Sequence, residues 1–124
     1  MQEILKKEIS LGENTIIGLF GGSFNPAHEW HYQVANHACD ILSLDKVIWL
    51  VSPHNPLKDK KTLYALKDRL ESAKKLGNSS NFIITDIEKK LKIQYSIDTI
   101  SIFQKTFTSK KFVWIMGSDN ADQI

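Results

Sequence analysis

The sequence contains little cysteine and no long apolar run. Cys39 is the one cysteine among 124 residues, so no disulfide framework can form and a reducing compartment fits. No segment approaches the roughly 20 apolar residues of a membrane-spanning helix. Lys6, Lys7 and Glu8 lie where a signal peptide needs an apolar run. We therefore expect a soluble cytoplasmic protein that has no membrane partner.

A strong excess of charge of one sign is also missing. The chain has 16 basic and 14 acidic residues, and the formal net charge of +2 is too small to indicate a nucleic-acid partner. The composition is 42% hydrophobic and 24% charged, which is ordinary for a globular protein with a modest core. At this length we expect a single domain, residues 1–124.

Short apolar runs alternate with segments of helical periodicity. The runs are rich in β-branched and aromatic residues and predict strands at 15–20, 46–51, 82–86 and 112–116. Apolar residues at helical spacing predict helices at about 29–42, 63–76 and 96–107. Residues 88–94 fit either an irregular connection or a short edge strand. The order predicts an α/β fold, with a Rossmann-like parallel sheet and helices on both faces. Ligands of such folds bind at the carboxyl ends of the strands.

The segment G-G-S-F-N-P-A-H-E-W-H, residues 21–31, joins the first predicted strand to the first predicted helix. Its glycines let the backbone approach a ligand closely, and the helix start offers free N–H groups to an anion. His28 and His31 lie one turn apart there, and we expect them to converge near the end of the strand. Taken alone, the glycines fit an ordinary turn, and the histidines fit half of a metal site without a third ligand. Together they favour phosphate binding, so we predict no metal ligands.

This segment resembles the nucleotidyltransferase signature G-G-[ST]-F-[DN]-P-x-H-x-G-H. With L-V-S-P-H-N-P-L-K, Y-S-I-D-T-I and W-I-M-G-S-D-N following in order, the chain is similar to bacterial nicotinate-nucleotide adenylyltransferases over most of its length. The resemblance implies transfer of the adenylyl group of ATP to nicotinate mononucleotide, giving deamido-NAD and pyrophosphate, with Mg²⁺ accompanying ATP. Two alternatives remain open: another adenylyl- or cytidylyltransferase of this superfamily, and a catalytically inactive, truncated remnant.

The resemblance also implies roles for individual residues. Catalytic contact with the ATP phosphates is implied for His28 and His31. Binding of ATP is implied for Gly21, Gly22, Ser23, Phe24, Gly117 and Asp119. Binding of the mononucleotide is implied for Lys58, Arg69, Asp98 and Thr99. Without the resemblance, Lys58 would be a solvated loop lysine and Arg69 an exposed helix charge. Asp98 would lie in the first turn of a helix, where an acidic residue is favourable, and Asp119 would be a helix N-cap.

Two features depart from the family pattern. Trp30 stands where the signature has glycine, and a packed Trp side chain buries roughly 150–250 Å². The indole either turns outward or obstructs the nucleotide, and we expect obstruction. The sequence ends soon after G-S-D-N, before the family's arginine-containing C-terminal motif, so we expect a domain without its last strand and helix.

Overall fold

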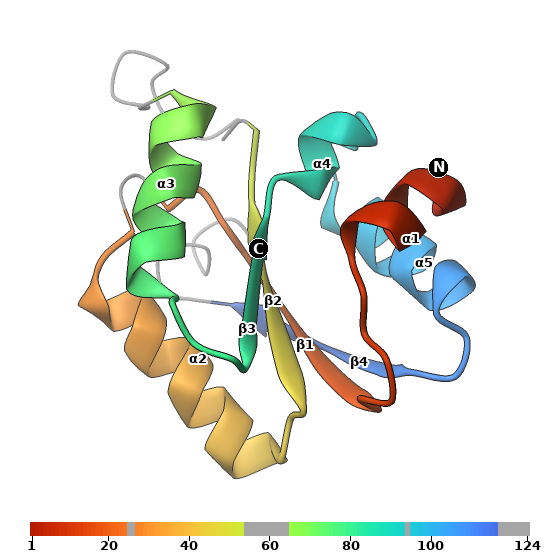
Figure 1. The fold of residues 1–124 in the computed structure, drawn as a ribbon, viewed down its shortest axis with the longest axis horizontal. Coiled ribbons are helices and arrows are strands. Elements are labelled where there is room, and N and C mark those ends of the chain that lie inside the picture. Colours follow the sequence, from red (N-terminus) through yellow and green to blue (C-terminus); the bar gives the residue numbers. More distant parts are fainter. Residues whose placement is uncertain (25–26, 54–64, 94, 117–124) are drawn as a thin grey trace.

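A computed structural model describes residues 1–24, 27–53, 65–93 and 95–116 (Figure 1). Its first half contains α1 (Gln2–Glu8), β1 (Ile16–Gly22), α2 (Glu29–Leu42) and β2 (Lys46–Val51). Its second half contains α3 (Leu66–Leu76), β3 (Phe82–Thr85), α4 (Ile87–Lys90), α5 (Ser96–Thr106) and β4 (Lys111–Met116).

The strands form a parallel sheet in the order β3-β2-β1-β4. Central strand β1 pairs with β2 on one side and with β4 on the other, so that Leu19 lies opposite both Ile48 and Trp114. All the pairings are parallel, and β1 and β2 are almost wholly buried, as expected for strands covered on both faces. The predicted α/β class and parallel sheet are confirmed.

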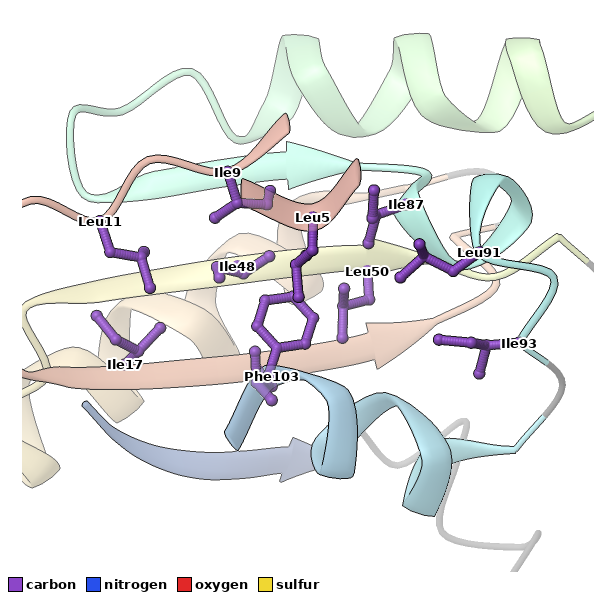
Figure 2. Packing of buried hydrophobic residues seen from close by; sticks show 11 residues of the cluster. Leu5, Ile9, Leu11, Ile17, Ile48, Leu50, Ile87, Leu91, Ile93 and Phe103 are labelled. Atoms are coloured by element: carbon purple, nitrogen blue, oxygen red, sulfur yellow. The ribbon is translucent and has the colours of Figure 1, made fainter. Parts of the chain in front are cut away.

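Helices cover both faces of the sheet, with α2 and α3 on one side and α1, α4 and α5 on the other (Figure 1). Successive residues of a strand point to opposite faces. Ile48 and Leu50 accordingly pack with Leu5 of α1, Ile87 of α4 and Phe103 of α5 (Figure 2).

The opposite face holds the second cluster. There the side chains of Val47 and Trp49 pack with Phe24, with Ala35 of α2 and with Ala73 of α3. The sheet thus separates two cores, and the loop after β1 contributes to the α2–α3 side.

The predicted strands and the three predicted helices are present with small shifts in their bounds. Helix α3 is described from Leu66, and the first residues of its predicted range lie outside the described part of the chain. Two short helices, α1 and α4, were not predicted. The ambiguous segment 88–94 contains the end of α4 followed by a turn as far as it is described, so the edge-strand alternative is wrong.

Candidate functional site

The two residues that follow β1, Ser23 and Phe24, are part of the buried interior. Phe24 has φ 48°, in the left-handed region that favours glycine, and its side chain is fully buried. Its ring stacks on Trp49 of β2, with ring centroids 5.4 Å apart and an interplanar angle of 10°. Ser23 is also buried. Side-chain packing therefore fixes Ser23 and Phe24, and these two residues can meet a ligand mainly through their backbone.

Gly21 is required by packing on the neighbouring strand. A Cβ atom at this position would lie 2.8 Å from Cη2 of Trp114, a distance that real Cβ atoms essentially never show. From the sequence, a glycine is expected here so that a ligand can approach the backbone closely, and that reason stays a prediction. The structure adds a second reason, the lack of space for a Cβ atom beside Trp114.

His28 and His31 stand together at the start of α2. His28 is the N-cap residue, and the two imidazole centroids are 4.3 Å apart. The His31 ring is 4.7 Å from the ring of Phe24 and 6.1 Å from that of Phe20 in β1. The predicted convergence of the two rings near the end of the first strand is confirmed.

A hydrogen bond orders the two imidazoles. The backbone N–H of His28 donates to Nδ1 of His31 at 3.1 Å. Because Nδ1 is the acceptor, a neutral His31 carries its proton on Nε2, which makes Nε2 a hydrogen-bond donor. His31 is 2% exposed, whereas His28 is exposed. The pair therefore offers one enclosed donor and one ring open to solvent.

Trp30 lies against both histidines. Its ring centroid is 5.9 Å from that of His28 and 5.6 Å from that of His31, with the His31 contact edge-on at 75°. The indole is half-buried. It thus stays beside the pair, and the expected obstruction of a nucleotide remains a prediction.

Arg69 of α3 is buried and bonded to backbone carbonyls. Nη1 donates to the carbonyl oxygens of Ser23 at 2.9 Å and Ser52 at 2.6 Å, and Nη2 donates to that of Pro53 at 3.3 Å. The side chain is 1% exposed, and this burial lowers the pKa of the guanidinium. The alternative of an exposed helix charge is therefore wrong. A contact of Arg69 with the mononucleotide stays a prediction.

Ser72, one turn further along α3, is a residue that the sequence analysis missed. Its Oγ accepts the N–H of Ala27 at 3.1 Å, and its hydroxyl donates to the carbonyl of Arg69 at 2.9 Å. Ala27 directly precedes the N-cap of α2. The only sequence signal is the spacing of three from Arg69, which places both residues on one side of the helix.

Thr99 joins α5 to α4. It is fully buried, and its Oγ1 donates to Oε2 of Glu88 at 2.6 Å. Burial raises the pKa of Glu88, and the hydrogen bond from Thr99 offsets part of that rise. Neighbouring Asp98 is exposed. Sequence reasoning did not find Glu88, which lies in the ambiguous segment, and binding of the mononucleotide by Thr99 or Asp98 remains a prediction.

The remaining candidates, Lys58, Gly117 and Asp119, lie outside the described residues. Within the described ranges, no three His, Cys, Asp or Glu side chains gather closely enough to hold a metal ion. A search of the same ranges finds no helix with the length and apolarity needed to cross a bilayer.

A central parallel strand that ends in Gly21 and Gly22, with a helix N-capped by His28 after it in the chain, defines a parallel α/β domain, a fold whose ligands usually bind at the carboxyl ends of the strands. Residues 19–124 match the family model described as cytidylyltransferase-like, and the chain belongs to this family.

Individual relatives are more specific. The chain is 48% identical over 104 residues to a protein of Caulobacter sp. (strain K31), covering 84% of this chain and 55% of that protein. It is 44% identical over 108 residues to a protein of Parvibaculum lavamentivorans, covering 87% of this chain and 54% of that protein. Both relatives are named as probable nicotinate-nucleotide adenylyltransferases, as the sequence resemblance implied. The chain spans about half the length of these curated relatives.

A solved structure supports the fold. The chain superposes on a Vibrio parahaemolyticus protein described as a nicotinate-nucleotide adenylyltransferase with a TM-score of 0.61 and 20% identity. The match covers 88% of this chain and 64% of that one.

Proposed function

We propose that this chain is a nucleotidyltransferase domain of NAD synthesis that acts in the cytoplasm. In the proposed reaction, ATP and nicotinate mononucleotide give deamido-NAD and pyrophosphate. The observation that carries the proposal is the His28–His31 pair, with ring centroids 4.3 Å apart at the start of α2. The names of the relatives at 48% and 44% identity supply the substrates.

The proposed chemistry needs no covalent enzyme intermediate. A phosphate oxygen of the mononucleotide attacks the α-phosphorus of ATP in line, and the bond to the bridging oxygen breaks as pyrophosphate leaves. Negative charge is concentrated on the phosphate oxygens, so donors fixed in place lower the barrier. His28 would donate from its exposed ring, and for His31 to donate from its enclosed Nε2, binding of ATP would have to uncover that nitrogen. The 14-residue helix α2 adds the positive end of its dipole.

The other assignments follow the family motif. Contact with ATP is proposed for Gly21, Gly22, Ser23, Phe24, Gly117 and Asp119. The mononucleotide side is proposed for Lys58, Arg69, Asp98 and Thr99. Because Ser23 and Phe24 are buried, they would act through their backbone. Arg69 and Thr99 are buried and donate to protein acceptors, so they would serve the substrate by holding the residues around it.

Mg²⁺ is the divalent metal that we propose to accompany ATP. This ion usually keeps several waters and binds through substrate phosphates and one or two carboxylates. It would neutralise charge on the triphosphate. We assign it no ligand among the described residues.

Two measurements on the purified chain test the proposal. Isothermal titration should detect binding of ATP–Mg²⁺, and pyrophosphate release should require nicotinate mononucleotide. Loss of one charge-stabilising donor costs roughly 10²–10³-fold in turnover, so His28→Ala and His31→Ala should each fall in that range. His37→Ala is the matched control, because His37 is an exposed histidine on the same helix. Absence of ATP binding, or equal losses in all three variants, would contradict the proposal.

A second candidate is another nucleotidyl transfer, which the cytidylyltransferase-like family model favours. A panel of ATP and CTP against nicotinate mononucleotide and phosphopantetheine separates the two candidates. Turnover of CTP or phosphopantetheine without turnover of nicotinate mononucleotide would select the second. ATP binding without turnover of any acceptor would favour an inactive nucleotide-binding protein.

A further inference from the structure

Helix α3 contacts the segment between β1 and α2 at both ends of that segment. Arg69 Nη1 donates to the carbonyl of Ser23 at 2.9 Å, directly after β1. Ser72 Oγ accepts the N–H of Ala27 at 3.1 Å, directly before His28. One helix thus holds the segment between β1 and α2 where it begins and where it ends.

Arg69 also joins this segment to the end of β2. The same Nη1 atom donates to Ser52 at 2.6 Å, and Nη2 donates to Pro53 at 3.3 Å. The backbone N–H of Ser52 in turn donates to the carbonyl of Gly22 at 2.9 Å. The carboxyl ends of two neighbouring strands are therefore tied together around one guanidinium.

The chemistry of arginine suits this arrangement. A guanidinium presents five N–H donors in a rigid plane and can serve several carbonyls at once, whereas an ammonium is a compact point charge on a flexible stem. A buried cation is unfavourable unless it is well hydrogen-bonded, and apolar side chains could pack a helix on a sheet without that penalty. The observed bonds therefore point to a role in loop geometry beyond helix packing.

We propose that Arg69 and Ser72 are positioning residues, through which α3 sets the place of the His28 and His31 rings relative to the ends of β1 and β2. The Ser72–Ala27 bond fixes the residue before the N-cap. The His28 N–H donates to Nδ1 of His31 at 3.1 Å, so the position of His28 also determines the position of the His31 ring. The ligand that benefits is the triphosphate of ATP, and this identity rests on the proposed function.

The experiment is NMR of the histidine rings in the 124-residue chain, combined with titration of ATP–Mg²⁺. Spectra are recorded well below the unfolding temperature. Ser72→Ala and Arg69→Lys should shift the ring resonances of His28 and His31, and His31 should lose the nitrogen shift of an Nδ1 acceptor. Because hydrogen bonds weaken when their partners are misaligned, misplacement of the rings should weaken ATP binding by roughly tenfold.

Three controls separate positioning from general stability. Glu71→Gln changes an exposed side chain of α3 between the two residues and should leave both rings unchanged. Ser72→Thr keeps the hydroxyl and should restore the wild-type spectrum. The His37 resonances should not move in any folded variant.

Ser72→Ala decides the proposal if Arg69→Lys does not fold, because Ser72 is only half-buried. Unchanged His28 and His31 resonances in folded Ser72→Ala overturn the proposal, whatever its thermal stability. If the wild-type chain does not bind ATP, the proposed function is contradicted. The ring resonances then still test whether Ser72 and Arg69 position the two histidines.

Discussion

At the scale of single residues, Trp30 distinguishes this chain from the signature it otherwise follows. The signature has glycine at this place, and the indole here lies 5.9 Å from the His28 ring and 5.6 Å from the His31 ring, centroid to centroid. Phosphate oxygens that accept hydrogen bonds from both imidazoles would have to share that space with the indole. The Trp30 side chain would therefore bear directly on the proposed binding of ATP.

We expect Trp30→Gly to tighten ATP binding by roughly tenfold, because removal of the indole opens the approach to both histidines. Tenfold in affinity corresponds to about 1.4 kcal/mol. Isothermal titration of ATP–Mg²⁺ measures the change. Trp30→Ala is the control, since alanine also removes the ring but keeps the helix propensity that glycine lowers by about 1 kcal/mol. Weaker binding in both variants would show instead that the indole contributes to the site.

The residues of the site differ in how far the sequence could reveal them. His28 and His31 could be placed because a spacing of three at a helix start brings two side chains together whatever surrounds them. The partners of Arg69 are backbone carbonyls of two loops, so no pattern of side chains in the sequence predicts them. The position of Ser23 and Ser52 depends on turns that only the folded sheet defines.

At the scale of elements, predictability follows length and periodicity. Helix α2 has 14 residues and a clear apolar face, whereas α1 buries only Leu5 in its seven residues and α4 has four residues. Such short helices give no repeat to detect, and packing on the sheet decides them. The ion pair between Glu8 and Lys90 adds a contact between α1 and α4 that no local pattern contains.

The contact between α4 and α5 makes a prediction about pH. Burial raises the pKa of Glu88, so the folded protein holds this proton more tightly than the unfolded chain does. The free energy of unfolding therefore falls as the pH rises from the ordinary Glu pKa of about 4.3 through the raised folded value. Glu88→Gln keeps an acceptor for Thr99 without the buried charge. We expect it to be more stable than the wild type at pH 7.5 and equally stable near pH 3.5.

Urea unfolding at the two pH values measures the difference. Glu71→Gln, at an exposed position of α3, is the matched control and should show no such dependence. A Glu88→Gln chain that is less stable than the wild type at pH 7.5 would mean that the ionised carboxylate is required between α4 and α5.

At the scale of the whole molecule, stability depends on the central strand. β1 is bonded on both sides, to β2 and β4, and each of its faces contributes to one of the two cores. Asp45, directly before β2, binds the start of β1: its Oδ2 accepts the N–H groups of Thr15 at 2.8 Å and Ile16 at 2.9 Å. The Asp45 N–H also donates to the carbonyl of Ile16 at 2.7 Å. Loss of these bonds would open the sheet at the starts of β1 and β2.

Asp45 should therefore contribute to the stability of the whole fold against unfolding in acid. The hydrogen bonds from Ile16 and Thr15 hold the pKa of this carboxyl below its usual range. Its stabilisation is present above the unfolded Asp pKa of about 3.9 and is lost as the pH falls through the lowered folded value. We expect Asp45→Asn to unfold at lower urea concentration than the wild type at pH 7, with a difference that shrinks below about pH 4. Asp68→Asn, at an exposed position of α3, is the control. A deficit in Asp45→Asn that stayed constant from pH 7 to pH 2.5 would show that the carboxylate charge has no part in joining the starts of β1 and β2.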